Sequence, residues 1–493
     1  MSGHDAPLLF ERSRAGRRAA RPPRVDGPPV EELLAGAALR EVAPKLPEVS
    51  ELDLVRHFTQ LAHRQFSIDG NVYPLGSCTM KYNPKVHEDA AMLFADLHPY
   101  QDPESAQGIL SLLGGLQHDL EVLTGMDEVT LQPAAGAHGE LAGMLMIRAY
   151  HRAAGEDAQR RIVIVPDAAH GTNPATASMV GYDVVEVPTG PNGEMDVAAF
   201  EAALSPEVAA VMLTNPSTLG IFESQIRRIA DAAHAVGAQL YYDGANLNAI
   251  VGKARPGDMG FDVVHLNLHK TFTTPHGGGG PGTGPVGVKE HLAPYLPAPV
   301  LTHGDDGWRW DEDRPRSIGR MRSYYGNVGN LVRAYAYIRT LGLDGLRDVA
   351  EKAVLNANYL RVRMAEQGYP SAYDRSCMHE FVARPPEGLR TLDVAKALLD
   401  EGMHPMTVYF PLVVKEAMMV EPTETESLES LDAYAEALGR IRELAVADPE
   451  AFAAAPRTTP VRRLDEVAAA RRPVLRWSPE THEAISGRED EAG

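Results

Sequence analysis

The feature that most restricts the fold of this chain is a regular alternation of short apolar segments with amphipathic ones. The apolar segments, most of them bounded by turn residues, are 161–166, 208–216, 238–246, 261–268 and 284–289. The segments between them, such as 196–205 and 223–237, are amphipathic. This alternation is typical of a mostly parallel sheet wrapped by helices, so we expect an α/β fold.

The length of 493 residues exceeds what one ordinary core supports, so two or three domains are expected. After about residue 330 a long helical region, 331–368, precedes a helix–strand–helix pattern, which is typical of a smaller α+β domain. The predicted parts are an N-terminal arm (1–50), a large α/β domain (51–330), a small C-terminal α+β domain (331–455) and a C-terminal extension (456–493).

The charge balance argues against a nucleic-acid-binding protein. The 47 basic and 67 acidic residues give a net charge of −20, whereas nucleic-acid-binding proteins usually carry a basic domain or stripe. One basic run occurs near the N-terminus, at Arg12, Arg14, Arg17, Arg18, Arg21 and Arg24. A transit peptide and an RNA-binding arm both fit it, but Asp5 and Glu11 argue against a transit peptide, and we favour a solvated arm.

Cysteine usage and hydropathy predict a soluble cytoplasmic protein. Cys78 and Cys377 are the two cysteines of the sequence, so no disulfide framework is implied and a reducing compartment fits. No apolar run approaches the ~20 residues that a membrane span needs. The start of the chain also lacks the pattern of a signal peptide.

Polar residues follow several of the predicted strands. Lys270, Asp243 and Asn215 come at or just after the ends of apolar runs, and His170 lies just beyond the run 161–166. In an open parallel sheet, ligands bind at the edge where the carboxyl ends of the strands meet. Four polar residues at such positions indicate a shared cleft.

These side chains together suit pyridoxal phosphate. A lysine amine forms a Schiff base with the cofactor aldehyde, a carboxylate keeps the pyridine nitrogen protonated, and an imidazole stacks on the ring. The phosphate needs backbone amides at a helix start. Ala135, Gly136 and Ala137 lead into a helical run and allow close approach of the backbone.

Each of these residues has a simpler explanation when taken alone. Lys270 is then a surface lysine, Asp243 a turn aspartate before Gly244, and His170 a turn cap. The four glycines at 277–280 fit a hinge or a nucleotide loop, but no Lys-Ser or Lys-Thr pair follows at P-loop spacing. The histidines occur singly rather than in an H-E-x-x-H pair, so no metal site is expected.

Longer motifs carry a resemblance to a known family. They are PLGSCTMKYNPK (74–85), HGTNPA (170–175), LTNPSTLGIFE (213–223), YYDGANLNAI (241–250), NLHKTFTTPHGGGGPG (267–282), YYGN (324–327), CMHEFV (377–382) and YFPLVVKEAMMVEPTETES (409–427). In these motifs the chain resembles the glycine decarboxylase (P-protein) family of the glycine cleavage system, over about residues 50–450. Its length is similar to that of subunit 2, the catalytic half in organisms that divide the enzyme over two genes.

The resemblance implies a fold-type I, aminotransferase-like pyridoxal-phosphate enzyme. Lys270 matches the lysine that carries the cofactor, Asp243 the partner of the pyridinium nitrogen, and His170 the ring stacked on the opposite face. The other matched positions are Gly136 and Ala137 at the phosphate, Ala245 near the ring, Asn215 near its hydroxyl and His269 in the lining.

The resemblance also implies a reaction and its partners. Glycine would lose carbon dioxide, and its aminomethyl group would pass to the lipoyl arm of the H-protein, an oxidoreductase reaction on a CH–NH2 donor with a disulfide acceptor. The expected partners are P-protein subunit 1, in a heterotetramer with two copies of each subunit, and the lipoylated H-protein. No residue is identified that would bind the glycine carboxylate.

Two other functions remain open from the sequence. One is a different pyridoxal-phosphate enzyme that acts alone, and the other is an inactive scaffold, against which the presence of Lys270, Asp243 and His170 argues. Cys78 and Cys377 both lie in the matched motifs. A redox pair is conceivable, but we favour two buried structural thiols.

Overall fold

The computed structural model describes residues 7–21, 23, 26–38, 40–42, 44–98, 101–277, 282–322, 326–476 and 478. The chain divides into two compact units, one of residues 1–65 with 450–493 and one of residues 66–449. Arg24, glycines 278–280, residues 324–325 of the YYGN motif and the end from 479 lie outside the described residues. The four-part division expected from the sequence stays a prediction.

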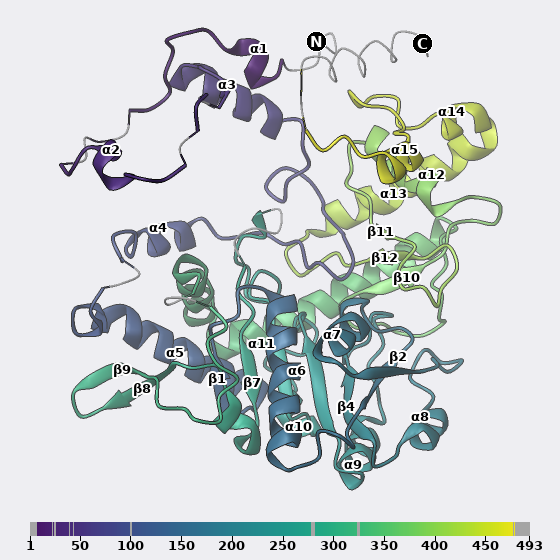
Figure 1. The fold of residues 1–493 in the computed structure, drawn as a ribbon. Coiled ribbons are helices and arrows are strands. Elements are labelled where there is room, and N and C mark those ends of the chain that lie inside the picture. The colour runs from purple at the N-terminus through teal and green to yellow at the C-terminus, as the bar shows by residue number, and fades with distance from the viewer. Residues whose placement is uncertain are drawn as a thin grey trace. The chain divides into compact units, whose positions relative to one another are not determined.

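A seven-stranded sheet organises the unit of residues 66–449 (Figure 1). Its strands, in spatial order, are β1 (Glu128–Thr130), β7 (Val286–Val288), β6 (Val263–Leu266), β5 (Gln239–Gly244), β4 (Val208–Leu213), β2 (Ile162–Pro166) and β3 (Asp183–Val187). The strands from β6 to β3 pair in parallel, and β7 is antiparallel to β6 and β1. The predicted α/β fold with a mostly parallel sheet is confirmed, although the run 284–289 supplies an antiparallel strand.

The central strands are buried on both faces, which explains their continuous apolar sequences. All residues of β4 and β5 are buried. Successive side chains of a strand point to opposite faces. Tyr241 therefore joins one core, together with Met146 and Ile147, while Tyr242 joins the other and packs against Phe261.

Helices supply the rest of both cores. The core of Tyr241 contains residues of α6 (Gly136–Ala153) and α7 (Thr172–Val180). The core of Tyr242 contains residues of α5 (Gln107–Thr124), α9 (Ile226–Ala235) and α11 (Val328–Glu366). The predicted long helical region is α11, which is two helices joined at Gly342, where φ is 60° and ψ is −172°.

A three-stranded antiparallel sheet lies further along the same unit. Its order is β10 (Phe381–Ala383), β12 (Met418–Val420) and β11 (Thr407–Val408), with α12 (Thr391–Asp400) and α13 (Leu428–Ala447) following β10 and β12 in sequence. Leu75 forms an antiparallel bridge with Val420. Segment 74–85 is thereby joined to the small sheet. The other elements of the unit are α4 (Val86–Met92), α8 (Val197–Ala203), α10 (Pro256–Met259), η1 (Pro103–Ala106), η3 (Glu290–Tyr295) and the hairpin of β8 (Val300–Gly304) and β9 (Gly307–Asp311).

The unit formed by the two ends of the chain consists of short helices. They are α1 (Leu9–Arg12), α2 (Val30–Leu33), α3 (Glu51–Ala62), α14 (Pro449–Ala453, which starts at the unit boundary) and α15 (Glu466–Arg471). Ser50 caps α3 by accepting a hydrogen bond from the backbone N–H of Asp53, and Arg17 of the basic run forms an ion pair with the Asp53 carboxylate. Across the described residues, we find no helix with the length and apolar character required to span a bilayer.

Candidate active site

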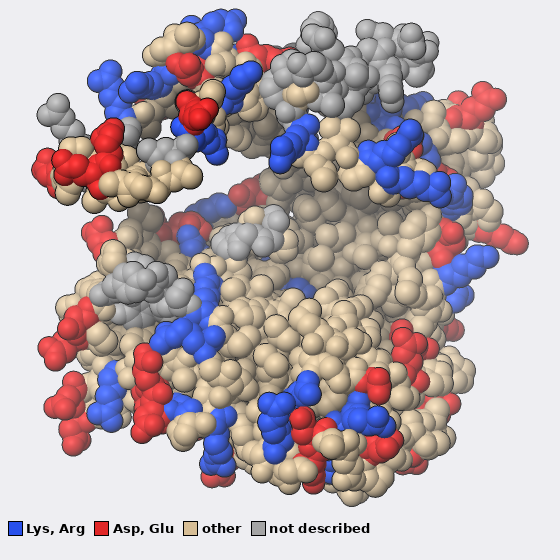
Figure 2. Space-filling view, in the orientation of Figure 1, with Lys and Arg blue, Asp and Glu red and all other residues tan. Residues whose placement is uncertain are grey.

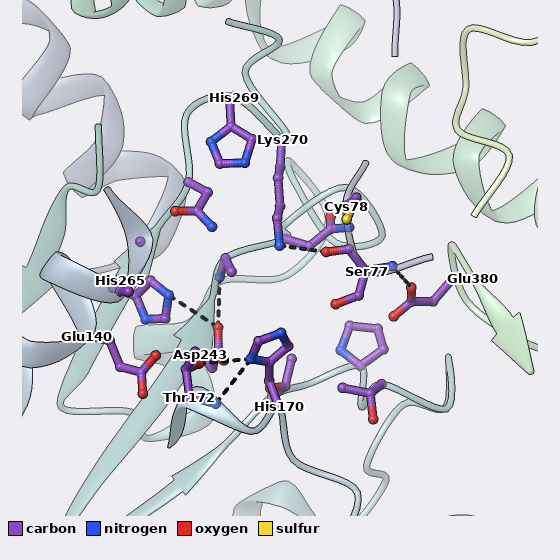
Figure 3. Close-up of a pocket in the computed structure, with 18 of the residues that line it drawn as sticks. Ser77, Cys78, Glu140, His170, Thr172, Asp243, His265, His269, Lys270 and Glu380 are labelled. Atoms are coloured by element: carbon purple, nitrogen blue, oxygen red, sulfur yellow. Dashed lines mark hydrogen bonds and ion pairs between the residues drawn. The ribbon is translucent and has the colours of Figure 1, made fainter. Parts of the chain in front are cut away.

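A cavity of about 260 Å³ lies where β4, β5 and β6 end, and the residues before β10 form part of its wall (Figure 3). The predicted site residues that line it are Gly136, Ala137, His170, Asp243, Ala245, His269 and Lys270. The shared cleft expected from the polar residues at strand ends is therefore present.

Two predicted residues lie outside the lining of this cavity. Ala135 is the residue before the first turn of α6. Asn215 is fully buried beside the cavity, and its side chain exchanges hydrogen bonds with the backbone of Glu223, at 2.9 Å and 3.4 Å. Its neighbours Thr214 and Pro216 line the cavity instead.

Asp243 is a buried carboxylate with several donors. The register of β5 and β6 pairs it with His265, whose Nε2 lies 3.3 Å from Oδ1. Asn173 Nδ2 donates to Oδ2 at 3.0 Å, and the backbone N–H of Ala245 donates to Oδ1 at 3.1 Å. Burial raises the pKa of Asp243, but His265, Asn173 and the charge of Lys270 outweigh it and hold the pKa below its ordinary value. The carboxylate therefore stays ionised inside the protein.

Lys270 belongs to a turn that follows β6, rather than to the strand itself. β6 ends at Leu266, and the backbone N–H of Lys270 donates to the carbonyl of Asn267 at 3.0 Å. The Lys270 Nζ donates to the carbonyl of Ser77 at 2.8 Å (Figure 3). The amine thus faces the cavity with one neutral partner, an arrangement suited to covalent attachment of an aldehyde.

The start of α6 approaches the end of β6 closely. A Cβ on Gly136 would lie 2.0 Å from Asn267 Oδ1, so a side chain there would displace the asparagine. No side chain caps this end of α6, and the buried Oδ1 of Asn267 and Oγ1 of Thr214 have no hydrogen-bond partner among the described residues. Uncapped N–H groups at the start of an 18-residue helix suit a phosphate.

His170 presents its imidazole to the same cavity. Its Nδ1 lies 2.9 Å from Oγ1 of Thr172 and 3.3 Å from the backbone nitrogen of that residue, which fixes the ring (Figure 3). Although His170 is exposed, the surrounding protein removes its ring partly from water and lowers its pKa, so the ring is neutral near pH 7. A flat neutral imidazole can stack on an aromatic ligand. Together with Lys270, Asp243 and the helix start, it makes the donor set fit pyridoxal phosphate.

Glu140 and His265 were missed from the sequence. Glu140 is 1% exposed on α6, one turn after Gly136, and its Oε1 has no hydrogen-bond partner among the described residues. Burial and the charge of Asp243 raise the pKa of Glu140 to about 7. His265 could have been identified only from the strand register that pairs it with Asp243. The spacing of Glu140 from the helix start was visible in the sequence, but it did not by itself indicate a role in the site.

Groups able to bind a metal occur at two places among the described residues, Glu140–Asp243–His265 and His379–Glu380–Glu421. Their carboxylates are largely occupied: Asp243 accepts from two N–H groups, and Glu421 accepts from Thr79 and Asn246. This favours hydrogen-bonding roles for both clusters.

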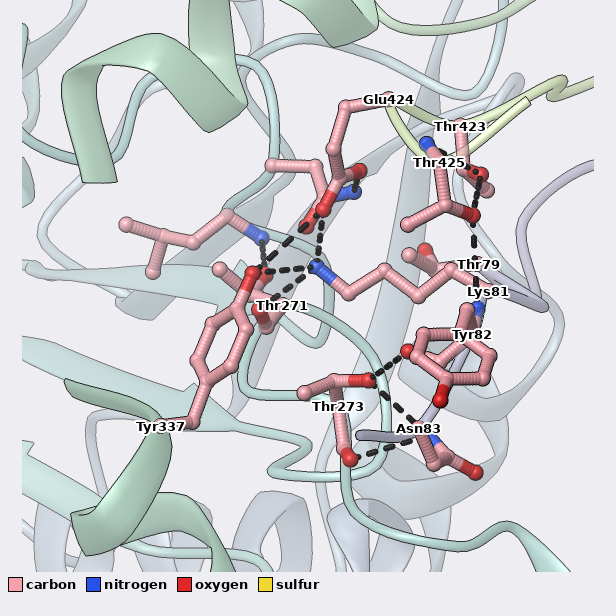
Figure 4. Close-up of polar contacts among 12 residues, drawn as sticks. Thr79, Lys81, Tyr82, Asn83, Thr271, Thr273, Tyr337, Thr423, Glu424 and Thr425 are labelled. Carbon is pink, nitrogen blue, oxygen red and sulfur yellow. Dashed lines mark hydrogen bonds and ion pairs between the residues drawn. The ribbon is translucent and has the colours of Figure 1, made fainter. Parts of the chain in front are cut away.

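A buried ion pair helps to fix the backbone next to Lys270 (Figure 4). Lys81 Nζ lies 2.6 Å from Glu424 Oε1, with both side chains almost fully buried, and donates to the carbonyl of Thr271 at 2.8 Å. Burial lowers the pKa of Lys81, but the attraction of Glu424 outweighs it and raises the pKa above its ordinary value. The ion pair joins segment 74–85 to Glu424, and the hydrogen bond from Lys81 joins the same segment to the residue after Lys270.

Further contacts between the same segments strengthen this link. Asn83 Nδ2 donates to the carbonyl and the hydroxyl of Thr273, both at 2.9 Å, and the Thr273 hydroxyl donates to the carbonyl of Tyr82 at 2.6 Å (Figure 4). The turn that carries Lys270 is thus held by residues about 190 positions away in sequence. This gives a structural reason for the PLGSCTMKYNPK motif.

Both cysteines are free thiols. Cys377 is buried, and burial raises its pKa to about 12. Cys78 is half-buried and lines the cavity, and burial also raises its pKa. A raised pKa keeps a thiol protonated and poorly reactive, which favours structural roles.

Two family models match most of the chain. One, described as Glycine cleavage system P-protein, matches residues 35–308, and one described as Glycine dehydrogenase, C-terminal domain, matches residues 349–456.

Two bacterial proteins described as "Probable glycine dehydrogenase (decarboxylating) subunit 2" are similar over nearly the whole length. The protein of Thermus thermophilus (strain ATCC 27634) is 62% identical over 474 residues, which are 96% of this chain and 99% of that one. The protein of Bacillus velezensis (strain DSM 23117) is 56% identical over 485 residues, which are 97% and 98% of the two chains.

Solved structures confirm the fold. A crystal structure of glycine decarboxylase (P-protein) of the glycine cleavage system, in inhibitor-bound form, matches with a TM-score of 0.71 at 23% identity, over 84% of this chain and 95% of that chain. A cysteine desulfurase from Thermococcus onnurineus NA1 matches with a TM-score of 0.59 at 14% identity, over 75% and 95%. The expected fold-type I architecture of pyridoxal-phosphate enzymes is confirmed.

Replacing Lys81 by Met should destabilise the protein strongly. The change leaves the Glu424 carboxylate buried without its partner, which costs about 3–5 kcal/mol. Lys85→Met, which breaks the exposed pair with Asp69, should cost less than about 1 kcal/mol. Urea unfolding of the two variants measures the difference in the free energy of unfolding. Equal losses of this free energy would show that the buried pair stabilises the protein no more than the exposed pair.

Replacing Glu140 by Gln should change how stability depends on pH. Because the folded pKa of about 7 lies above the ordinary 4.5, the folded state holds the proton more tightly. Stability contributed by protonated Glu140 is full below about pH 4.5 and is lost as the pH rises to 7, by about 1.4 kcal/mol per pKa unit.

The melting temperature, measured without added ligand from about pH 5 to pH 8, checks this expectation. Wild type should lose stability relative to Glu140→Gln across this range, whereas Glu436→Gln, at an exposed position of α13, should follow wild type. Parallel curves for wild type and Glu140→Gln would contradict the assigned protonation of this carboxyl.

Proposed function

This chain belongs to the glycine cleavage system P-protein family, within its glycine dehydrogenase (decarboxylating) subunit 2 group, and from that premise we propose how its cavity acts. It binds pyridoxal phosphate at Lys270, decarboxylates glycine, and transfers the remaining aminomethyl group to the lipoyl arm of the H-protein. One observation carries the proposal: an ionised buried carboxylate, an amine and an uncapped helix start share a single cavity.

The residues would divide the binding of the cofactor among them. Lys270 holds the aldehyde carbon, and Asp243 holds the proton on the pyridine nitrogen, because its carboxylate stays ionised although it is buried. The start of α6 binds the phosphate, and His170 covers one face of the ring. When bound, the cofactor supplies an electron sink for the electron pair that decarboxylation leaves behind.

Glu140 and His265 would support Asp243. The hydroxyl of Tyr241 lies 2.6 Å from Nδ1 of His265, so the ring is oriented at both nitrogens. Glu140, with its raised pKa, is largely neutral below pH 7 and then adds no second negative charge beside Asp243. The proton of a bound pyridine ring therefore has one strong acceptor, the Asp243 carboxylate.

The subunit 2 description of the relatives implies a subunit 1. We place the chain in a heterotetramer with two copies of each subunit, which meets lipoylated H-protein. The cytoplasm is the proposed compartment, because a chain with two free cysteines suits reducing conditions.

Lys270→Ala should abolish covalent cofactor attachment. Wild type incubated with pyridoxal phosphate should show a visible absorbance band. Borohydride reduction should replace it by a near-ultraviolet band that survives dialysis, because reduction turns the C=N bond to the lysine into a stable C–N bond. The variant should show neither band, while Lys253→Ala, at an exposed lysine outside the cavity lining, should keep both. A stable band in Lys270→Ala would reject the assignment.

Activity should depend on the partners. Release of labelled carbon dioxide from carboxyl-labelled glycine should need this chain, subunit 1 and lipoylated H-protein together for its full rate. Full release by the chain alone would favour a self-sufficient pyridoxal-phosphate enzyme, and a protein that never takes up the cofactor would favour an inactive scaffold.

A further inference from the structure

His379 is a buried imidazole on the wall of the cavity, two residues before β10. Its side chain is 3% exposed, and neither ring nitrogen has a hydrogen-bond partner among the described residues. Its Nε2 lies 3.7 Å from Oε1 of Glu380, beyond hydrogen-bond distance. Buried polar groups nearly always have partners, so an unpaired ring that lines a cavity points to contact with a ligand.

The backbone around His379 is fixed before any ligand arrives. The N–H of Met378 donates to the carbonyl of Gly220 at 2.7 Å. Gly220 has a φ of 72°, and a Cβ there would lie 1.7 Å from the carbonyl oxygen of Glu380. The loop after β4 therefore packs against the residues on both sides of His379, and the imidazole is presented to the cavity by a preformed support.

The carboxylates near His379 are engaged elsewhere. Glu380 Oε2 accepts from the backbone N–H of Ser77 at 2.7 Å. Glu421 accepts from the backbone N–H and the hydroxyl of Thr79, at 3.0 Å and 2.6 Å. Burial and the charge of Glu421 raise the pKa of Glu380 well above its ordinary value, which favours the protonated, neutral form of this carboxyl.

The ring is neutral as well, because burial lowers the pKa of His379. A neutral imidazole offers one N–H donor and one acceptor. Among the described residues that line the cavity, Lys270 is the one lysine, and no arginine is present. Under the proposed function its amine is bonded to the cofactor when glycine enters, so the donors of this chain that first meet the carboxylate are neutral.

We propose that the His379 imidazole donates a hydrogen bond to the carboxylate of bound glycine. This inference rests on the proposed function and deepens it, because it names the residue of this chain that binds the group which leaves. Glycine is the amino acid without a side chain, so its carboxylate is the feature that distinguishes it from a simple amine.

A neutral donor suits a carboxylate that must be lost. The bond between the α-carbon and the carboxylate carbon breaks, its electron pair stays on the amino-acid fragment, and carbon dioxide leaves without charge. His379 keeps its proton throughout. An arginine would stabilise the charged ground state strongly, and that stabilisation would disappear as the charge leaves the carboxylate, whereas a neutral imidazole orients the group at a smaller cost to the rate.

The test compares glycine with methylamine, which lacks the carboxylate, in the assembled enzyme of this chain and subunit 1 loaded with cofactor. The change in cofactor absorbance on titration gives an apparent Kd for each amine. His379→Leu should weaken glycine about tenfold or more and leave methylamine unchanged, because the lost hydrogen bond goes to a charged group. His379→Gln, which keeps an N–H donor, should recover part of the loss.

His87 offers a matched control. It is also a buried histidine, 4% exposed, with Nδ1 unpaired among the described residues, but it lies on α4 and outside the cavity lining. His87→Leu should keep the wild-type affinities. If His379→Leu does not retain the cofactor band, His379→Gln replaces it in the comparison. A weaker affinity of His379→Gln for glycine, with an unchanged affinity for methylamine, then supports the proposal.

Three results would overturn the inference. The first is an unchanged affinity for glycine in a His379 variant that retains the cofactor band. The second is an equal loss of affinity for glycine and for methylamine. Loss of the band in both His379 variants with the fold intact would show that the ring serves the cofactor instead. Absence of the band in the wild-type assembly would instead reject the proposed function, and the inference with it.

Discussion

The ion pair of Lys81 and Glu424 is the contact on which the geometry of the cavity depends. Two charges removed from water are tolerated only when each satisfies the other, so the chain segments that carry them have one favourable arrangement. Lys81 also donates to the carbonyl of Thr271, directly after Lys270. The position of the reactive amine is therefore tied to the segment that follows β12 and to residues near the start of the unit.

A second constraint is the unequal protonation of two neighbouring carboxyl groups. Asp243 has N–H donors and a nearby imidazole, and it stays ionised. Burial and the charge of Asp243 both disfavour the ionised form of Glu140, which therefore retains its proton up to about pH 7. One buried site thus contains a single strong proton acceptor, which is the requirement for keeping a pyridine nitrogen protonated.

The sequence was most informative where a function needs one residue type at a strand end or a helix start. Lys270, Asp243 and Gly136 could be predicted because strand ends of a parallel sheet converge. Asn215 lies outside the cavity lining and accepts a hydrogen bond from the backbone of Glu223, whereas its neighbours Thr214 and Pro216 line the cavity. Its expected place near the ring hydroxyl stays a prediction.

Contacts between distant segments were beyond sequence reasoning. Lys81 and Glu424 are 343 residues apart. The local sequence around either residue does not indicate that the other is its partner. The pairing of Asp243 with His265 needed the strand register, and the unpaired ring of His379 needed the packing of Gly220 against Glu380. The motifs that contain these residues were visible, but their roles are properties of the assembled cavity.

The tight joining of segment 74–85 to both sheets has a consequence for how ligands enter. If the small sheet moved away from the large one, either the ion pair of Lys81 with Glu424 or the contacts of Asn83 with Thr273 would have to break. Opening the cavity by moving the small sheet is therefore costly in free energy, so we expect ligands to enter without a wide separation of the two sheets.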